Sequence, residues 1–264
     1  MEIFGILNVT PDSFSDGGRF LDVDAAVSHA HEMRRAGASV IDVGGESTRP
    51  GSSPVSSQEE ISRIKDVVST LVAEGFRVSL DTSKAKVAEL GIDLGVHYIN
   101  DVTGGLGDSN MLAMLATSKV EVILMHWRGA SNVMDSLAIY DDVVSDVIKE
   151  LQARLDAAME AGIASDRIIL DPGFGFAKNS EHNWEILAKI DVLQQLHPRL
   201  LLGASRKRFL KEVVSEDTEL QRDLVTAALS GYAYIWNVWG VRVHNVAVTN
   251  QVIETYKRID EVEQ

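Results

Sequence analysis

The 264-residue sequence contains no cysteine, only 5 prolines, and far fewer basic than acidic residues. Without cysteine, the chain cannot form disulfides, thiolate nucleophiles, zinc fingers or iron–sulfur clusters. The 25 Lys and Arg against 39 Asp and Glu give a net charge of −14, which argues against a nucleic-acid-binding protein, because phosphate neutralisation needs clustered cations. The same charge repels small anions at long range, so any anion site must be built locally.

Long hydrophobic runs are also missing. No apolar stretch approaches the ~20 residues needed to cross a bilayer. The apolar first residues carry no cationic start and soon meet Asn8 and Pro11, so they do not read as a signal peptide. We therefore expect a cytoplasmic protein that binds neither membrane nor nucleic acid.

Short β-branched runs alternate with longer amphipathic segments along the whole chain. We predict strands at 3–8, 40–43, 78–81, 98–101, 122–125, 168–171, 200–203 and 241–244. Their continuous apolar character is typical of parallel strands buried on both faces. Because no linker or composition shift interrupts the alternation, we predict one domain over residues 1–264, a (β/α)8 TIM barrel. A doubly wound open sheet is the alternative.

Two connections differ from the rest. Those after the first and second strands, residues 10–22 and 44–56, are long and rich in Gly, Ser and Pro. Loops of that length are usually functional or disordered, and both leave the catalytic face of such a barrel. The second leads into a helix that we expect to start at Ser57, with Glu60 completing a capping box.

Almost every predicted strand ends in a polar residue. The set comprises Asn8, Asp42, Asp81, Asn100, Asp101, His126, Asp171, Lys207, Arg242 and His244. Taken singly, Asp42 and Asp101 are best explained as caps of the following turn or helix. For His126 we favour a structural or loop-anchoring role over a metal site. If the barrel is correct, however, all strand ends converge on one pocket, and a shared site explains the set better.

The chemistry of this set excludes several enzyme classes. It holds no Ser–His–Asp order, no HExxH and no glycosidase-like pair of glutamates. Asp81, Asn100, Asp171 and Lys207 suit a flat heterocycle, because a carboxylate accepts two parallel N–H donors and an ammonium donates to a ring carbonyl or nitrogen. Arg49, Arg242 and His244 offer a second sub-site for an anion such as phosphate.

The motifs themselves resemble those of the dihydropteroate synthase family, the sulfonamide-target enzymes of folate biosynthesis. They run in order along nearly the whole chain: NVTPDSFSDGG (8–18), IDVGGESTRPG (41–51), SLDTSK (79–84), INDVTGG (99–105), LMHWRG (124–129), LDPGFGFAKN (170–179), GASRKRFL (203–210) and VRVH (241–244). The resemblance implies a transferase that joins 6-hydroxymethyl-7,8-dihydropterin diphosphate to p-aminobenzoate and releases diphosphate, forming 7,8-dihydropteroate.

The resemblance also implies roles for individual residues. The pterin set is Asp81, Asn100, Met125, Asp171, Gly203 and Lys207. The diphosphate set is Asn8, Arg49, Arg242 and His244, with Asn8 also meeting the Mg²⁺ cofactor. The p-aminobenzoate pocket is Phe14, Thr48, Pro50, Phe176 and Ser205. The residues expected to act in catalysis are Asp16, Arg49, Asp81, Asp171 and Lys207.

No general base stands out, and none is needed if the C–O bond ionises before the amine attacks. The carboxylates would then stabilise the cation, and Mg²⁺ and the arginines the leaving diphosphate. Two alternatives remain open: a pterin-binding methyltransferase, which shares the heterocycle-reading residues, and a catalytically silent pterin-binding paralogue.

The sequence departs from the family pattern in three places. It starts at its first strand, so we expect a less plugged barrel bottom. Lys211 stands where Gly is usual, and Asn245 stands where Asp is usual, which puts the hydrogen bonding of the last turn in doubt. Tyr232, Tyr234, Trp236 and Trp239 form an aromatic cluster that core packing explains best. The alternative is that this cluster forms a subunit interface, because the resemblance implies a homodimer.

Overall fold

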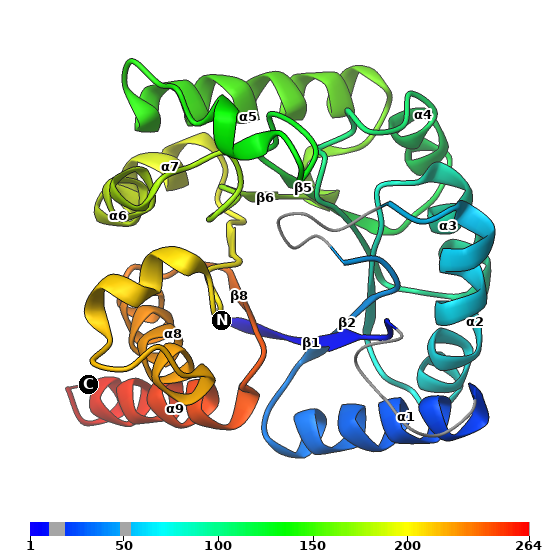
Figure 1. Cartoon of the computed structure of the whole chain (residues 1–264), viewed down its shortest axis with the longest axis horizontal. Helices are drawn as coiled ribbons and strands as arrows, with labels where there is room; N and C mark the ends of the chain where they lie inside the picture. Colours follow the sequence, from blue (N-terminus) through cyan, green and yellow to red (C-terminus); the bar gives the residue numbers. More distant parts are fainter. Residues whose placement is uncertain (11–18, 48–53, 264) are drawn as a thin grey trace.

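A computed structural model describes residues 1–10, 19–47 and 54–263, and it confirms the predicted barrel. Eight parallel strands follow the order β6-β5-β4-β3-β2-β1-β8-β7, and an isolated bridge between Leu170 and Leu200 joins the two end strands. Pairing of the first strand with the last, together with this bridge, closes the sheet into a ring and rules out the open, doubly wound alternative. In Figure 1 the strands form a central ring, the helices lie around it, and α8 and α9 lie side by side.

All eight strands lie within about one residue of their predicted positions. They are β1 (Glu2–Asn8), β2 (Val40–Gly44), β3 (Val78–Asp81), β4 (Tyr98–Asp101), β5 (Glu121–Met125), β6 (Ile168–Asp171), β7 (Leu201–Leu202) and β8 (Gly240–Val243). The outer layer contains α1 (Arg19–Arg35), α2 (Ser57–Ala73), α3 (Ala85–Leu94), α4 (Met111–Ala116), α5 (Val143–Glu160), α6 (Ser180–Ala188), α7 (Ile190–Leu196), α8 (Glu219–Ile235) and α9 (Val246–Glu263). Within the described ranges there are also three 3₁₀ turns, namely η1 (Met134–Leu137), η2 (Ser165–Arg167) and η3 (Arg208–Val213). No helix in the part of the chain that the structure describes is long and apolar enough to cross a bilayer.

The helix boundaries follow local capping chemistry. The predicted start of α2 at Ser57 is confirmed, but the predicted cap is wrong by one residue, since Ser56 Oγ accepts the N–H of Glu59 at 3.2 Å. Glu60, which was to close the capping box, is instead buried and accepts a hydrogen bond from Lys84 Nζ at 2.6 Å. An ion pair from the next helical unit therefore decides the orientation of Glu60.

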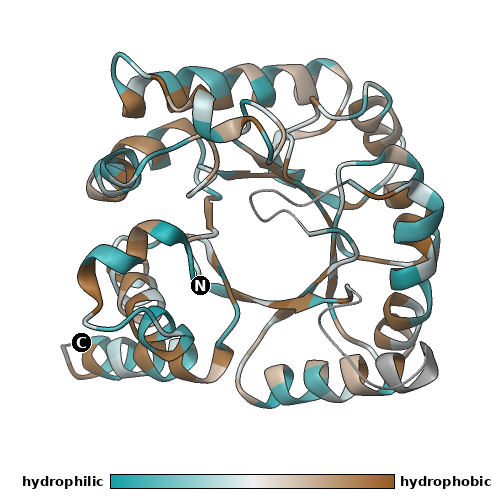
Figure 2. Cartoon of the chain, viewed as in Figure 1, coloured by the Kyte–Doolittle hydropathy of each residue, from teal (hydrophilic) through white to brown (hydrophobic). Residues whose placement is uncertain are grey.

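The hydrophobic core has an outer and an inner part. Outward side chains such as Ile41, Leu80 and Leu124 pack under the helices. In Figure 2 the strands are largely hydrophobic, whereas the helices alternate between hydrophobic and hydrophilic residues. Inward side chains fill the lower barrel, where the Phe4 ring lies 5.3 Å from Tyr98 and 5.7 Å from Trp239. Large aromatic rings therefore fill the barrel interior near the amino ends of the strands.

Candidate active site

The strand register places polar side chains directly above the apolar filling of the barrel. Residues two apart on a strand share a face, so Asn100 lies above Tyr98 and Asp171 above Ile169. The register then pairs Asn8 with Gly44, Gly44 with Asp81, and Asp81 with Asn100. Sequence positions up to 92 residues apart thus come to one level at the carboxyl ends of the strands.

Asp171, at the end of β6, is buried and oriented by its own turn. Its Oδ1 accepts the N–H of Gly173 at 2.7 Å. Its Oδ2 faces Gly203, where the Cβ of any other residue would lie only 3.0 Å from it. Burial raises the pKa of Asp171 to about 6, against the lowering effects of the Gly173 N–H and of the charges on Arg242, Lys207 and Lys178. The carboxylate is therefore ionised at neutral pH.

Lys207, in the turn after β7, reaches the same space. Its Nζ lies 4.0 Å from the centroid of the Phe176 ring, a cation–π contact. Its stem passes so close to Gly175 that a Cβ there would lie 2.9 Å from Lys207 Cδ, and Gly175 has a φ of +73°. Burial and the charge of Arg242 lower the pKa of Lys207 to about 8, while Asp171 and Asp81 raise it.

Arg242, on β8, bridges two buried carboxylates at the centre of the barrel. Its Nε donates to Asp42 Oδ2 at 2.5 Å and its Nη2 to Asp81 Oδ2 at 2.6 Å. Burial raises the pKa of Asp81, and Arg242 opposes that rise. The capping interpretation is wrong for Asp42, whose carboxylate pairs with Arg242. It is right for Asp101, which accepts the N–H groups of Thr103 and Gly105 at 2.8 and 2.7 Å.

Ser205 and His244 form a hydrogen-bonded pair across the ends of β7 and β8. Ser205 Oγ lies 2.9 Å from His244 Nδ1 and accepts the His244 backbone N–H at 3.1 Å. Burial, together with the charges of Arg206 and Arg242, lowers the pKa of His244 to about 3, so the imidazole is neutral. Arg206 points away: its φ is +57°, and its guanidinium pairs with Asp223 at 2.7 Å.

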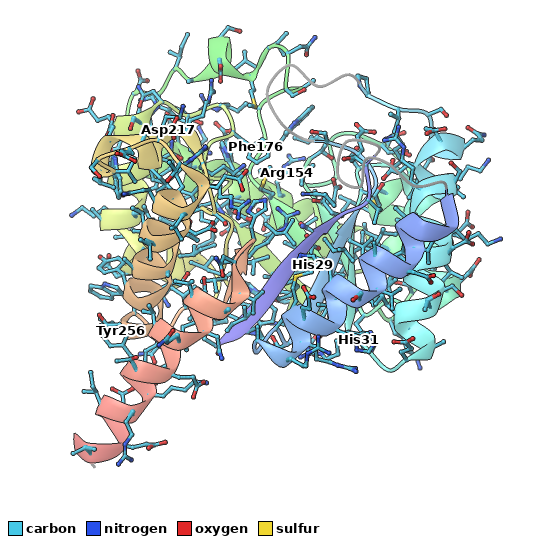
Figure 3. The ribbon with its side chains drawn as sticks, turned by 60° about the horizontal axis from the view of Figure 1, so that its bottom comes forward. His29, His31, Arg154, Phe176, Asp217 and Tyr256 are labelled. Carbon is cyan, nitrogen blue, oxygen red and sulfur yellow. The ribbon has the colours of Figure 1, made fainter. Side chains whose placement is uncertain are left out.

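One cavity of about 1090 Å³ connects these groups. Its walls include Asn8, Asp81, Phe176, Lys178, Gly203, Ser205, Lys207, Arg242 and His244. Figure 3 shows Phe176 toward the end of the barrel at which β1 finishes, with Tyr256 of α9 toward the other end. Carboxylates, an amide and cations on one cavity can bind a flat, hydrogen-bonding ring together with an anionic group. Among the described residues, no group of three His, Asp or Glu could hold a metal ion by itself.

Comparison with known proteins decides the family. The sequence model of the family described as pterin binding enzymes matches residues 4–244. A dihydropteroate synthase of Mycobacterium leprae is 44% identical over 252 residues, which is 93% of this chain and 89% of the relative. The chain belongs to the dihydropteroate synthase family. Members of this family generally use Mg²⁺.

Solved dihydropteroate synthases share the fold. The enzyme from Anaplasma phagocytophilum, with bound 6-hydroxymethylpterin-monophosphate, has a TM-score of 0.89 and 41% identity, covering 98% of both chains. The enzyme from Xanthomonas albilineans, with 4-aminobenzoic acid, has a TM-score of 0.91 and 38% identity, covering 98% of this chain and 93% of that one.

Measured against the expectations for a dihydropteroate synthase, the structure brings most predicted site residues together. Asn8, Asp81, Phe176, Gly203, Ser205, Lys207, Arg242 and His244 line one cavity, and Asn100, Met125 and Asp171 are buried at the ends of their strands. Phe14, Asp16, Thr48, Arg49 and Pro50 lie outside the described residues. The two departures in the later turns have partners. Lys211 pairs with Asp217 at 2.6 Å. Asn245 Oδ1 accepts the N–H of Val248 at 3.3 Å, and its Nδ2 donates to Asp223 at 3.1 Å.

The sequence pattern does not single out two buried residues of the site. Asp42 has the local pattern of a cap, and Lys178 stands within the motif 170–179, although it is 5% exposed and lines the cavity. His126 does act as an anchor, since its Nδ1 lies 2.9 Å from Lys178 Nζ. The signal for Lys178 was a lysine inside an otherwise apolar, glycine-rich turn, and only its partners reveal its burial.

Proposed function

We propose that this chain condenses 6-hydroxymethyl-7,8-dihydropterin diphosphate with p-aminobenzoate, forming 7,8-dihydropteroate and releasing diphosphate. The observation that carries the proposal is the meeting of Asp81, Asn100, Asp171 and Lys207 at one end of the barrel. A pterin offers adjacent ring N–H and amino donors, which a fixed carboxylate such as Asp171 accepts in parallel. The Lys207 ammonium donates to the ring on the opposite side.

The anionic end of the substrate is assigned to the β1 and β8 side of the cavity. Neutral His244 can donate from a ring nitrogen to a phosphate oxygen, and the Arg242 guanidinium supplies a fixed positive charge. Arg49, predicted to share this role, lies outside the described residues. Asn8 offers one amide oxygen, which suits a Mg²⁺ ion bound mainly through phosphates and water. When bound, Mg²⁺ would neutralise charge on the leaving diphosphate.

The reaction needs orientation and charge stabilisation more than proton transfer. The C–O bond to diphosphate breaks with its electron pair leaving on oxygen, the amine nitrogen then bonds to the methylene carbon, and the ammonium proton passes to water. The buried carboxylates of Asp81 and Asp171 stabilise the positive charge that develops on the pterin methylene. Phe176 and Lys207 form one side of the space in which p-aminobenzoate would bind. Family resemblance assigns Phe14, Thr48, Pro50 and Ser205 to the same pocket.

The two alternatives predict different chemistry. A pterin-binding methyltransferase would bind the pterin ring but would have no need of the anion sub-site around His244 and Arg242. A silent paralogue would bind the substrates without turnover. The matched relatives are named as synthases, which favours the proposed reaction. We also infer a homodimer, supported by exposed apolar side chains at the end of α8, Ile235 and Trp236, and on α9, Ile259.

Diphosphate release tests the proposal directly. Release from the pterin substrate should require Mg²⁺, and with p-aminobenzoate present dihydropteroate should form in an amount equal to the diphosphate released. Lys207→Ala and Asp171→Ala should abolish product while circular dichroism shows an intact fold, with surface Lys149→Ala as the control. Turnover retained in both site variants would overturn the site assignment, and absence of dihydropteroate when both substrates and Mg²⁺ are present would overturn the reaction.

A further inference from the structure

Lys178 is a buried cation to which the proposed reaction assigns no task. It closes the turn after β6, and its Nζ donates to the carbonyl oxygens of Gly173 and Phe176, each at 3.1 Å. The third contact is His126 Nδ1 at 2.9 Å. An ammonium carries three N–H donors, so these contacts account for all of them. The turn is wrapped around the lysine head group.

His126 connects this ammonium to the outer helical layer. Because Nδ1 faces an N–H donor, the ring proton belongs on Nε2, which lies 2.9 Å from Glu150 Oε2 on α5. Glu150 is in turn held by Arg128, whose Nη2 donates to Oε1 at 2.5 Å. Burial and the charge of Lys178 lower the pKa of His126 to about 4. The imidazole is therefore a neutral, oriented link.

The turn that Lys178 anchors carries two groups of the site. Asp171 begins it, and Phe176, whose ring contacts Lys207, lies near its end. Two further hydrogen bonds hold the same turn: Tyr140 Oη donates to the Ala177 carbonyl at 2.9 Å, and Asn183 Oδ1 accepts the Gly175 N–H at 2.8 Å. Ala177 has a φ of +47°, a left-handed conformation that costs energy for a residue with a Cβ.

We propose that Lys178 is a positioning residue, which fixes the turn over residues 172–178 and with it the Asp171 carboxylate and the Phe176 ring, and that His126 and Glu150 hold Lys178 in place from behind. This inference rests on the proposed function for its substrates. It assigns the His126–Glu150 pair a supporting role that extends from the cavity to the surface of α5.

Electrostatics gives Lys178 a second effect on Asp171. Its charge, with those of Arg242 and Lys207, opposes the rise that burial causes in the pKa of Asp171. Burial lowers the pKa of Lys178 itself to about 7; Asp171 and Glu150 raise it, and Arg128 and Lys207 lower it. Removing the lysine charge should therefore shift the ionisation of Asp171 to higher pH.

The first test compares Lys178→Met and Lys178→Arg with the matched surface control Lys149→Met, after activity of the unaltered chain has been established. We expect Lys178→Met to raise KM for both substrates by roughly 30-fold or more and to lower kcat by a smaller factor. The pH below which affinity for the pterin substrate falls (the acid limb of its pH profile) should move upward. Lys178→Arg keeps the charge, so the acid limb should return close to its position in the unaltered chain. KM should recover less, because the planar guanidinium fits three converging acceptors poorly. Unchanged KM and an unshifted pH profile in Lys178→Met would overturn the proposal.

The second test does not depend on the folding of that variant. In the unaltered chain, ¹⁵N NMR of His126 should show the Nε2–H tautomer, neutral down to about pH 5, as its pKa of about 4 requires. Glu150→Ala, at a half-exposed position, should raise KM several-fold in the same direction as Lys178→Met. An Nδ1–H tautomer, or Glu150→Ala kinetics equal to those of Lys149→Met, would contradict the proposal that His126 and Glu150 hold Lys178 in place. Absence of turnover in the unaltered chain would instead count against the proposed function, and the NMR result would still stand.

Discussion

The two ends of the barrel use the same strands for opposite purposes. At the amino ends, Phe4, Tyr98 and Trp239 fill the interior, and charged residues pair at the rim, Arg77 with Glu2 and Arg199 with Glu121. At the carboxyl ends, Asp81, Lys207 and Arg242 line a cavity, and the buried carboxylates of Asp42 and Asp171 lie behind them. Buried charges cost stability unless well paired, whereas buried aromatic rings provide it. The end of the barrel formed by the amino ends of the strands (the lower end) therefore stabilises the fold. The end formed by their carboxyl ends (the upper end) serves binding.

The sharpest test of this division is a cavity at the lower end. Phe4→Ala should reduce the free energy of unfolding by about 3–5 kcal/mol, because it removes a fully buried ring. Denaturant unfolding would measure the change. The kcat per folded molecule, determined at low temperature, should stay near that of the unaltered chain. A large loss of kcat in folded Phe4→Ala would show that the two ends are coupled.

The complementary change at the upper end is Lys207→Met. Loss of a buried charged donor should lower kcat/KM by roughly 30- to 3,000-fold. The melting temperature should be unchanged or higher, since an apolar side chain replaces an ammonium whose pKa burial lowers to about 8. Steady-state kinetics and calorimetry on the same preparation check both halves. A variant that loses stability and activity together would argue that Lys207 is structural.

The upper end should also respond to pH. Asp171, with a pKa near 6, is charged above that value, and Lys207, with a pKa near 8, is charged below its own. Affinity for the dihydropterin should therefore be highest between about pH 6 and 8 and fall about tenfold per pH unit on either side. Titration calorimetry from pH 4.5 to 9.5 measures this. Lys207→Met should lose the fall in affinity at alkaline pH and move the fall at acid pH upward, because the Lys207 charge also lowers the pKa of Asp171.

The smallest effect is expected at the rim of the lower end. Arg77 pairs with Glu2, and both side chains are substantially exposed, at 42% and 28%. Arg77→Ala should cost no more than about 1 kcal/mol of stability and leave kcat/KM unchanged. Chemical denaturation at low and high salt would resolve the small difference. A loss as large as that of Phe4→Ala would mean that the ionic rim contributes as much as the aromatic filling.

The sequence predicted the strands well and the network between them only in part. Continuous apolar runs located all eight strands, and the polar residues that end them marked Asp81, Asn100 and Asp171. The role of Asp42 could not be foreseen, because its partner Arg242 lies 200 positions away. A short polar residue after a strand has the same local pattern whether it caps a turn, as Asp101 does, or pairs across a barrel.

A second error had the same origin. Glu60 matched a capping motif, but Lys84 of the next unit draws it inward. Local sequence patterns indicate backbone geometry. They do not predict which side chain from a distant part of the sequence the fold will bring into contact.

By itself, then, the sequence determined the repeat of strand and helix, the residue types at the strand ends and the motifs that mark the family. These follow from periodicity and from order along the chain, which local physics already fixes. Only the tertiary structure decided which carboxylate holds Arg242, that Lys178 is a buried ammonium rather than a surface charge, and that His244 is neutral. Those properties depend on burial and on long-range pairing, and both arise only when the barrel closes.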